Sequence, residues 1–329
     1  MSSHQLNSFI NSRYCLYCTM FITVLLAVAL LWFSCGETAH QYNGLTTTLQ
    51  GIAITLDKNM LGTMGIVAIG ATGMLMGMLN TKFAFIREFT VIYASALLLS
   101  SLTNPDILMS APADMSMSII VLACSFILFS GYQEFASRSY VFLISLILSF
   151  ASIFQYSVLF FIVPFFIGFG QMQLFSFKNV LAMILGLATP YWIGIGFNLI
   201  PLESISFPAL NISFEHYGNV LNLNTAINLA LTIIIGTTFG LINIIKIMNY
   251  RLQLRSYNGF FNVLAIFTMI FAIIDIDNVQ GYLTILNVCM SYQIAHFFTI
   301  QHFAKRYILF LAFAAIFIAL AVINILNII

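Results

Sequence analysis

The chain has 329 residues, of which 61% are hydrophobic and 6% are charged, and its formal net charge is +1. A water-soluble domain needs roughly 25% charged residues to cover its surface, so lipid must solvate much of this chain. The small net charge provides no field that would attract nucleic acid, so we expect no nucleic-acid partner.

Apolar runs recur along the whole chain and define its organisation. They predict an all-α fold, a polytopic membrane helix bundle of about eleven transmembrane helices that forms a single integral-membrane helical domain over residues 1–329. The hairpin of spans five and six turns at Gln155 and Tyr156, and it is short enough to be either two full spans or a re-entrant pair. The predicted spans are approximately 15–35, 60–80, 90–103, 115–131, 139–154, 157–170, 179–200, 225–245, 259–274, 282–303 and 307–326.

The charged residues orient these spans. All Lys and Arg residues except Lys58 lie in every second gap between apolar runs, and most acids lie in the other gaps. Short loops rich in Lys and Arg stay in the cytoplasm, so we predict a cytoplasmic N-terminus and a periplasmic C-terminus in a bacterial inner (cytoplasmic) membrane. The first run, which follows Arg13, is long enough to remain as a signal-anchor helix rather than a cleaved signal peptide.

Three spans carry patterns typical of helix packing. Small residues on one face let membrane helices approach closely, and a polar stripe in lipid must face protein or water. We therefore predict close packing along the second span, a kink at Pro190 and interhelical hydrogen bonds from the tenth span. For the glycines of the second span and for the kink at Pro190, a substrate groove is the alternative interpretation. The residues concerned are Gly62, Gly65, Gly70, Gly73 and Gly77 in the second span, and Thr284, Asn287, Ser291, Gln293 and His296 in the tenth.

The loop after the first span contains a second helical period. Leu45, Leu49, Ile52 and Leu56 are spaced by steps of four and three residues. That spacing predicts a short amphipathic helix lying on the outer leaflet.

The outer loops hold the candidate residues for chemistry. A carboxylate at the membrane surface could act as a general base on a hydroxyl group, or it could hold a divalent metal together with a phosphate. The alternative is that acids gather outside because bases are kept inside, and that they only solvate the loops. No nucleotide-binding or catalytic motif indicates a cofactor, and a divalent metal remains open. The catalytic candidate is Glu37, and the candidate substrate-binding residues are His40, Asp57, Lys58, Asp106, Glu215 and His216.

Two resemblances accompany this reading. The order of a first span, an outer loop with an acid and a short hairpin over residues 137–168 resembles the membrane glycosyltransferases that use polyprenyl-phosphate sugars, the C-type superfamily. This resemblance implies that the catalytic acid is Glu37, although the superfamily usually has Asp there. The region from Asn80 to Trp192, which contains the run LGLATPYW, resembles a family of polytopic inner-membrane proteins from Bacteroidota. That second resemblance implies a location and a fold rather than an activity.

These observations are compatible with three functions. The first is a C-type-like glycosyltransferase acting on lipid-linked sugars at the outer leaflet, whose partners would be membrane lipids and a polyprenyl-phosphate-linked sugar. The second is a non-catalytic membrane subunit of a cell-envelope or secretion complex, whose partners would be other envelope proteins. The third is a lipid or solute transporter. The spans carry no Asp, Glu, Lys or Arg at their centres, which argues against a transporter coupled to protons or sodium ions.

Overall fold

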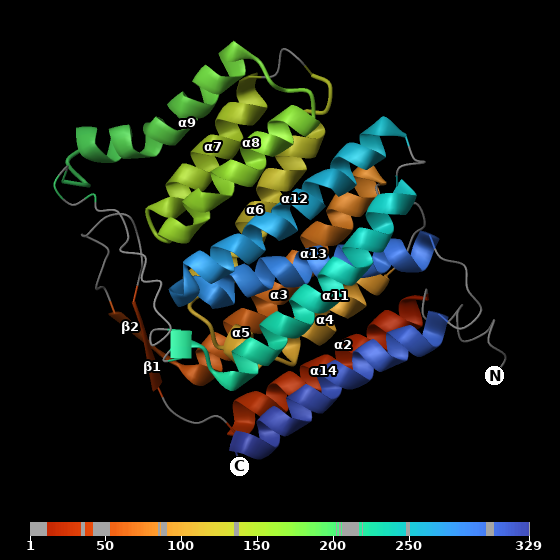
Figure 1. The fold of residues 1–329 in the computed structure, drawn as a ribbon. Coiled ribbons are helices and arrows are strands. Elements are labelled where there is room, and N and C mark those ends of the chain that lie inside the picture. The colour runs from red at the N-terminus through yellow and green to blue at the C-terminus, as the bar shows by residue number, and fades with distance from the viewer. Residues whose placement is uncertain are drawn as a thin grey trace.

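A computed structural model shows a bundle of helices with one small antiparallel pair of strands (Figure 1). It describes residues 12–33, 37–41, 53–84, 86, 91–134, 138–201, 203, 205, 217–218, 220–247, 251–300 and 306–328. The elements are α2 (Arg13–Phe33), β1 (Glu37–Gln41), β2 (Ala53–Asp57), α3 (Lys58–Phe83), α4 (Ile92–Leu102), α5 (Pro105–Leu108), α6 (Pro112–Ser130), α7 (Arg138–Ser152), η1 (Tyr156–Phe161), α8 (Ile162–Gln171), α9 (Phe177–Gly196), α11 (Leu223–Ile247), α12 (Leu252–Ile274), η3 (Ile276–Asn278), α13 (Val279–Ile300) and α14 (Arg306–Ile328).

The bundle has two chemically different ends. At one end, which we call the basic end, Lys82 of α3 donates a hydrogen bond through Nζ to Ser130 Oγ of α6 at 3.1 Å. At the other, which we call the sheet end because it carries β1 and β2, Thr225 of α11 donates to Asp106 Oδ2 of α5 at 2.5 Å. The helices run up and down between the two ends, so successive loops lie at alternate ends. Most bases therefore lie at one end and most acids at the other, as the sequence pattern predicts. The orientation of these ends across a membrane stays a prediction from that pattern.

Among the described residues, seven helices are long and apolar enough to cross a membrane, so the chain is a multi-pass membrane protein. Their outward faces carry large apolar side chains, such as Trp192, which is 80% exposed. Three further apolar helices, α4, α7 and the continuous η1–α8 unit, are shorter, and α13 is long but more polar. The predicted count of about eleven spans therefore rests on these four additional helices and stays a prediction. The seven are Arg13–Trp32, Met60–Phe83, Pro112–Ser130, Phe177–Gly196, Leu223–Ile247, Leu252–Ile274 and Tyr307–Leu326.

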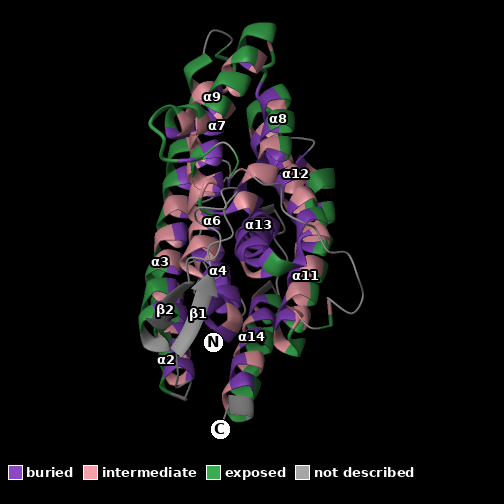
Figure 2. Ribbon diagram, turned by 90° about the vertical axis from the view of Figure 1, so that its left-hand side faces the viewer, coloured by how far each residue is buried: buried purple, intermediate pink, exposed green. Residues whose placement is uncertain are grey.

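Helix α13 occupies the centre of the bundle. It packs against α4, α6, α11 and α12, and it is buried almost along its whole length (Figure 2). Asn287 and Gln293 bond to other helices, as predicted, whereas Thr284 and Ser291 donate to carbonyl oxygens of α13 itself. Asn287 Oδ1 accepts from Thr232 Oγ1 at 3.1 Å, and its Nδ2 donates to Ser101 Oγ at 3.3 Å. Because these groups are satisfied within the protein, a helix with this many polar side chains can lie in the interior.

The glycines of α3 serve close packing at some positions and not at others. A Cβ atom on Gly65 would lie 2.3 Å from the carbonyl oxygen of Leu108 in α5, and one on Gly62 would lie 2.0 Å from Leu31 of α2. Nothing lies within 4 Å of the corresponding position on Gly70. The predicted close packing is therefore confirmed at the sheet end of the helix, where α5 and α2 contact it.

The loop after α2 contains strand rather than the predicted helix over its described part. Residues Ala53–Asp57 form β2 and pair antiparallel with Glu37–Gln41, whereas the sequence predicted a helix from Leu45 to Leu56. That prediction is wrong for residues 53–56, and residues 42–52 lie outside the described part of the chain. The leucine spacing describes only local periodicity, whereas pairing with β1 satisfies the backbone groups of this segment.

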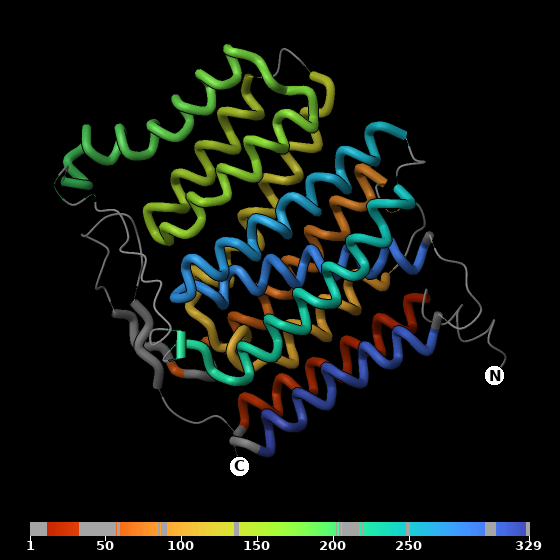
Figure 3. The backbone as a smooth tube through the Cα atoms, in the orientation of Figure 1, coloured from red at the N-terminus to blue at the C-terminus, as the bar shows by residue number. Residues whose placement is uncertain are grey.

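The segment α7–η1–α8 forms the predicted hairpin, and α9 packs along α7 (Figure 3). A Cβ atom on Gly186 of α9 would lie 2.6 Å from the carbonyl oxygen of Phe142, and Ser149 Oγ donates to the carbonyl oxygen of Leu187 at 2.6 Å. Pro190 lies inside α9, which changes direction along its length in Figure 1. The glycine and the kinked helix thus serve packing of α9 against the hairpin.

Candidate functional site

The most polar buried assembly of the described chain lies at the sheet end, around Asp275. It combines side chains from four segments that the sequence separates widely, namely the first turn of α6, the start of η1, the end of α12 and the start of α13. We call it the Asp275 cluster, and its members are Asp114, Gln155, Tyr156, Asp275, Asn278 and Tyr282.

Local structure places Asp275 at a helix junction. The residue ends α12, where its backbone N–H donates to the carbonyl oxygen of Phe271 at 2.8 Å. A single turn, η3, follows, and Asn278 comes directly before α13. The chain therefore reverses between two long helices within a few residues. Asp275 and Asn278 point into the bundle, since they are only 2% and 1% exposed, whereas Asp277 is exposed.

Every oxygen of the Asp275 carboxyl group accepts hydrogen bonds. Tyr156 donates its hydroxyl hydrogen to Oδ1 at 2.7 Å, and Tyr282 donates to Oδ2 at 2.8 Å. Asn278 Nδ2 lies 3.0 Å from Oδ1 and 2.9 Å from Oδ2. Four acceptor contacts match the capacity of a carboxylate, so this group can be buried without unsatisfied oxygens.

A second carboxylate is linked to this one through two amides. Gln155 Nε2 donates to Asp114 Oδ1 at 3.0 Å and to Asn278 Oδ1 at 2.6 Å. The backbone of α13 also approaches Asp114 closely, because a Cβ atom on Gly281 would lie 3.0 Å from Asp114 Oδ1 and 2.2 Å from Met117 Sδ. Glycine at position 281 is thus what allows α13 to cross α6 at this contact.

Burial raises the pKa of Asp275 above its ordinary value of 3.8, and the nearby charge of Asp277 acts in the same direction. The hydrogen bonds from Tyr156, Asn278 and Tyr282 favour the charged form and oppose the rise. Because its oxygens are already engaged, Asp275 can hold segments together or exchange a proton, but a ligand would have to displace its donors. Within the described residues, no group of three or more His, Cys, Asp or Glu side chains is placed to hold a metal ion.

The predicted catalytic residue, Glu37, begins β1 and is the register partner of Asp57, which ends β2. His40 pairs with Ile54 further along the same ladder. Asp57 is exposed and precedes α3 without capping it through its side chain. The side chains of Glu37, His40 and Lys58 lie outside what the structure describes. The pairing nevertheless brings the backbones of two predicted acids together across the hairpin.

Asp106 occupies a different part of the sheet end. It lies in the first turn of α5, where its backbone N–H donates to Asn104 Oδ1 at 3.0 Å, and its carboxylate accepts from Thr225. This contact joins α5 to the start of α11. Glu215 and His216 lie outside the described residues, so their predicted role near the substrate stays a prediction.

None of the six members of the Asp275 cluster belongs to the predicted site. Asp114 and Asp275 are recognisable in the sequence only as acids of the outer gaps, and Gln155 and Tyr156 only as a turn. One available signal is the presence of Gln155 between two apolar runs, since a polar residue at the tip of a short membrane hairpin needs a partner. The identity of that partner depends on how four segments meet.

No known protein family, curated protein or solved structure matches this chain. The fold and the cluster define a multi-pass membrane protein with two buried acids, Asp114 and Asp275, in one hydrogen-bonded cluster at the sheet end.

Proposed function

We propose that the chain transfers a sugar from a polyprenyl-phosphate donor at the leaflet of the sheet end, with Glu37 as the general base. The observation that carries this proposal is the register of the strand pair, which sets Glu37 opposite Asp57. Asp57 directly precedes α3, and Glu37 comes four positions after the last residue of α2, near where a lipid-linked sugar would present its head group. A carboxylate there can accept the proton of the acceptor hydroxyl while its oxygen bonds to the anomeric carbon of the sugar, and the polyprenyl phosphate leaves with the electron pair of the broken C–O bond. Asp57, Lys58 and Asp106 are the proposed neighbours of the substrate.

The test is a substitution that keeps the shape of Glu37 and removes its charge. Glu37→Gln should abolish assembly of the cell-envelope glycan that depends on this protein, while the variant reaches the membrane in normal amounts. Glu203→Gln is the matched control, because Glu203 is another exposed acid in a predicted outer loop. Normal glycan assembly with Glu37→Gln would rule out the catalytic role.

A second candidate function is a non-catalytic subunit of an envelope or secretion complex. It is supported by the way the interior is filled by α13 and by the use of Asp275 and Asp106 as contacts between helices. Under this proposal, the protein co-purifies with stoichiometric partners from gently solubilised membranes, and the Glu37→Gln variant retains both the partners and the phenotype of the unaltered protein.

A further inference from the structure

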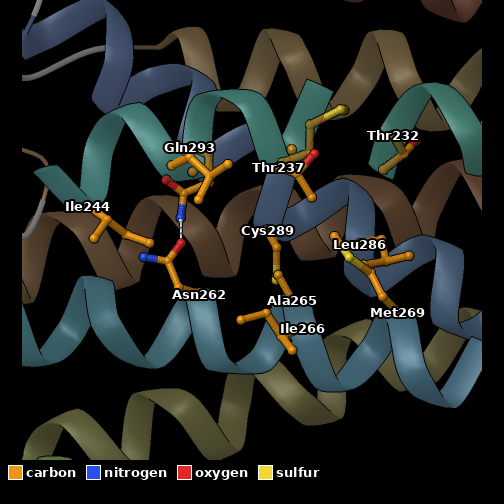
Figure 4. A pocket seen from close by; sticks show the side chains of 14 residues that line it. Thr232, Thr237, Ile244, Asn262, Ala265, Ile266, Met269, Leu286, Cys289 and Gln293 are labelled. Carbon is orange, nitrogen blue, oxygen red and sulfur yellow. Dashed lines mark hydrogen bonds between the residues drawn. The ribbon is translucent and has the colours of Figure 1, made fainter. Parts of the chain in front are cut away.

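A lateral groove runs between α11 and α12, with α13 as its floor (Figure 4). Both α11 and α12 pack along α13, but they contact one another much less. The empty space between them, counted out to the open mouth of the groove, is about 590 Å³. Its lining is mainly aliphatic and sulfur-containing, with Leu241, Ile244, Ala265, Ile266, Met269 and Cys289 among the residues that form it.

Two glycines of α11 leave room for this groove. A Cβ atom on Gly236 would only reach ordinary contact with Met290, at 3.7 Å, and one on Gly240 would lie 3.5 Å from Asn262 Oδ1. The rim opens to the apolar perimeter of the bundle, since Leu241 is 64% exposed and Ile266 is 55% exposed. In a membrane protein this opening faces lipid chains.

The groove continues into a more polar, open cavity at the basic end, whose empty space, counted out to its mouth, is about 700 Å³. The two spaces share Ile244 and Asn262 as lining residues. The polar cavity is further lined by Gln171, Arg255, Ser256 and Asn258. Arg255 is the charged residue among those that line either space.

One amide in this cavity has an unused acceptor. Within the described residues, Gln171 Oε1 is buried without a hydrogen-bond partner. The Gln171 amide packs beside Gly259, since a Cβ atom there would lie 3.7 Å from Nε2 and 3.8 Å from Oε1. A buried amide oxygen without a partner is destabilising, so a hydroxyl-bearing ligand would satisfy it once the Gln171 amide turned toward the cavity.

We propose that the two spaces together bind an anionic glycerophospholipid of the leaflet at the basic end. The phosphate lies beside Arg255 and Ser256, a glycerol-type head-group hydroxyl donates to Gln171, and one acyl chain lies in the groove over α13. Arginine forms strong, charge-assisted hydrogen bonds with phosphate oxygens. The distance along α12 from Arg255 to Met269 is about 21 Å at a rise of about 1.5 Å per residue, which accommodates an acyl chain of one leaflet.

This inference does not rest on the proposed glycosyl transfer, because that reaction is placed at the opposite end of the bundle. The head group is identified by charge complementarity, and the tail by the apolar lining. A phospholipid of this kind would stabilise the cleft between α11 and α12, which protein contacts alone leave open.

The experiment measures lipid retention by native mass spectrometry on the delipidated, detergent-solubilised full chain. Phosphatidylglycerol and phosphatidylcholine with identical acyl chains are added separately. Both lipids carry the phosphate, but only phosphatidylglycerol has a net negative charge beside Arg255 and a head-group hydroxyl for Gln171. The unaltered protein should therefore retain phosphatidylglycerol about tenfold more tightly than phosphatidylcholine, since one hydrogen bond of this kind changes affinity by roughly that factor. Equal retention of the two lipids would overturn the proposal.

Two variants separate the head-group site from the groove. Arg255→Gln should remove the preference for phosphatidylglycerol, whereas Arg251→Gln, an exposed cation of the same end outside the cavity lining, should preserve it. Gly236→Leu should fill the groove and reduce retention of both lipids about tenfold or more. Ile266→Trp serves the same purpose from the exposed rim, should the glycine variant fail to fold. Unchanged retention in Arg255→Gln, or in every groove variant that folds, contradicts the assignment.

Competition identifies the source of the phosphate. Inorganic phosphate should not displace phosphatidylglycerol, because it has no chain to occupy the groove. If a polyprenyl phosphate displaced phosphatidylglycerol when added at a lower concentration than that lipid, the assignment to a glycerophospholipid would be overturned.

Discussion

Tyr282 of α13 donates a hydrogen bond to Asp275 Oδ2 at 2.8 Å, which ties the first turn of the central helix to the residue that ends α12. Tyr156 approaches the other oxygen of the same carboxyl group from the hairpin tip at 2.7 Å. One side chain thus fixes how three parts of the bundle meet. Because the Asp275 side chain is buried, replacing it should lower the free energy of unfolding.

The first prediction concerns this carboxyl group. Asp275→Asn places an amide N–H₂ where two oxygens accept from Tyr156, Asn278 and Tyr282, so at least one donor must face another donor. We expect the free energy of unfolding to fall by about 3 kcal/mol, as for other buried charged hydrogen bonds. Unfolding of the purified protein in mixed detergent measures this change. Glu134→Gln, an exposed acid at the basic end, is the control and should change stability by less than about 0.5 kcal/mol.

The second prediction is a pH dependence. Burial raises the pKa of Asp275 in the folded protein above 3.8, so the folded state binds this proton more tightly than the unfolded chain. The stability linked to Asp275 is therefore fully present below the unfolded pKa and is lost as pH rises through the raised folded pKa. The difference in unfolding free energy between the unaltered protein and Asp275→Asn should shrink as pH rises from about 4. A difference that grows with pH would contradict the raised pKa.

The third prediction compares two glycines of α3. Gly65→Ala forces a methyl group against the backbone oxygen of Leu108, which cannot rotate away, so we expect a loss of about 2–3 kcal/mol. Gly70→Ala meets open space and should be neutral or stabilising by up to about 1 kcal/mol, because alanine favours helix. Thermal denaturation of both variants in the same detergent provides the measurement. Equal effects would mean that the contact between α3 and α5 does not limit their approach.

The fourth prediction concerns the polar centre of α13. Asn287→Leu removes the hydrogen bonds to Thr232 and Ser101 and should cost about 1–2 kcal/mol. A double-mutant cycle with Thr232→Val isolates the pair, and its coupling energy should be about 0.6 kcal/mol, typical of interhelical hydrogen bonds in membranes. Thr63→Val is the control, because Thr63 bonds only within its own helix in the described structure. A coupling energy of zero would mean that these two side chains act independently.

The fifth prediction tests the orientation of the two ends. In a cysteine-free protein, Asp277→Cys at the sheet end should react with a membrane-impermeant maleimide in cells whose outer membrane is permeabilised and whose inner membrane is intact. Lys178→Cys at the basic end should react only after the inner membrane is opened. Both positions are exposed, so access to the thiol depends on the side of the membrane. The opposite pattern would place the strand pair and its acids in the cytoplasm.

The sequence alone predicted the helical membrane class, the polar bonding of α13 and the short hairpin. These features follow from local properties, because hydropathy over a span decides whether a helix enters lipid and Asn287 or Gln293 must bond wherever its helix lies. The glycine pattern of α3 predicted close helix packing for the same reason. Only the fold decided that Gly65 is contacted by another helix and that Gly70 is not.

Tertiary structure alone decided which polar groups meet. Glu37 and Asp57 are opposite because two strands pair, while the leucine spacing of the same loop indicated a helix. Asp114, Gln155 and Asp275 are far apart in the chain, and their association depends on how α6, the hairpin and α13 pack. Hydropathy depends on each residue's own side chain, whereas a hydrogen-bonded cluster or a lateral groove depends on distances between segments, which no local pattern encodes.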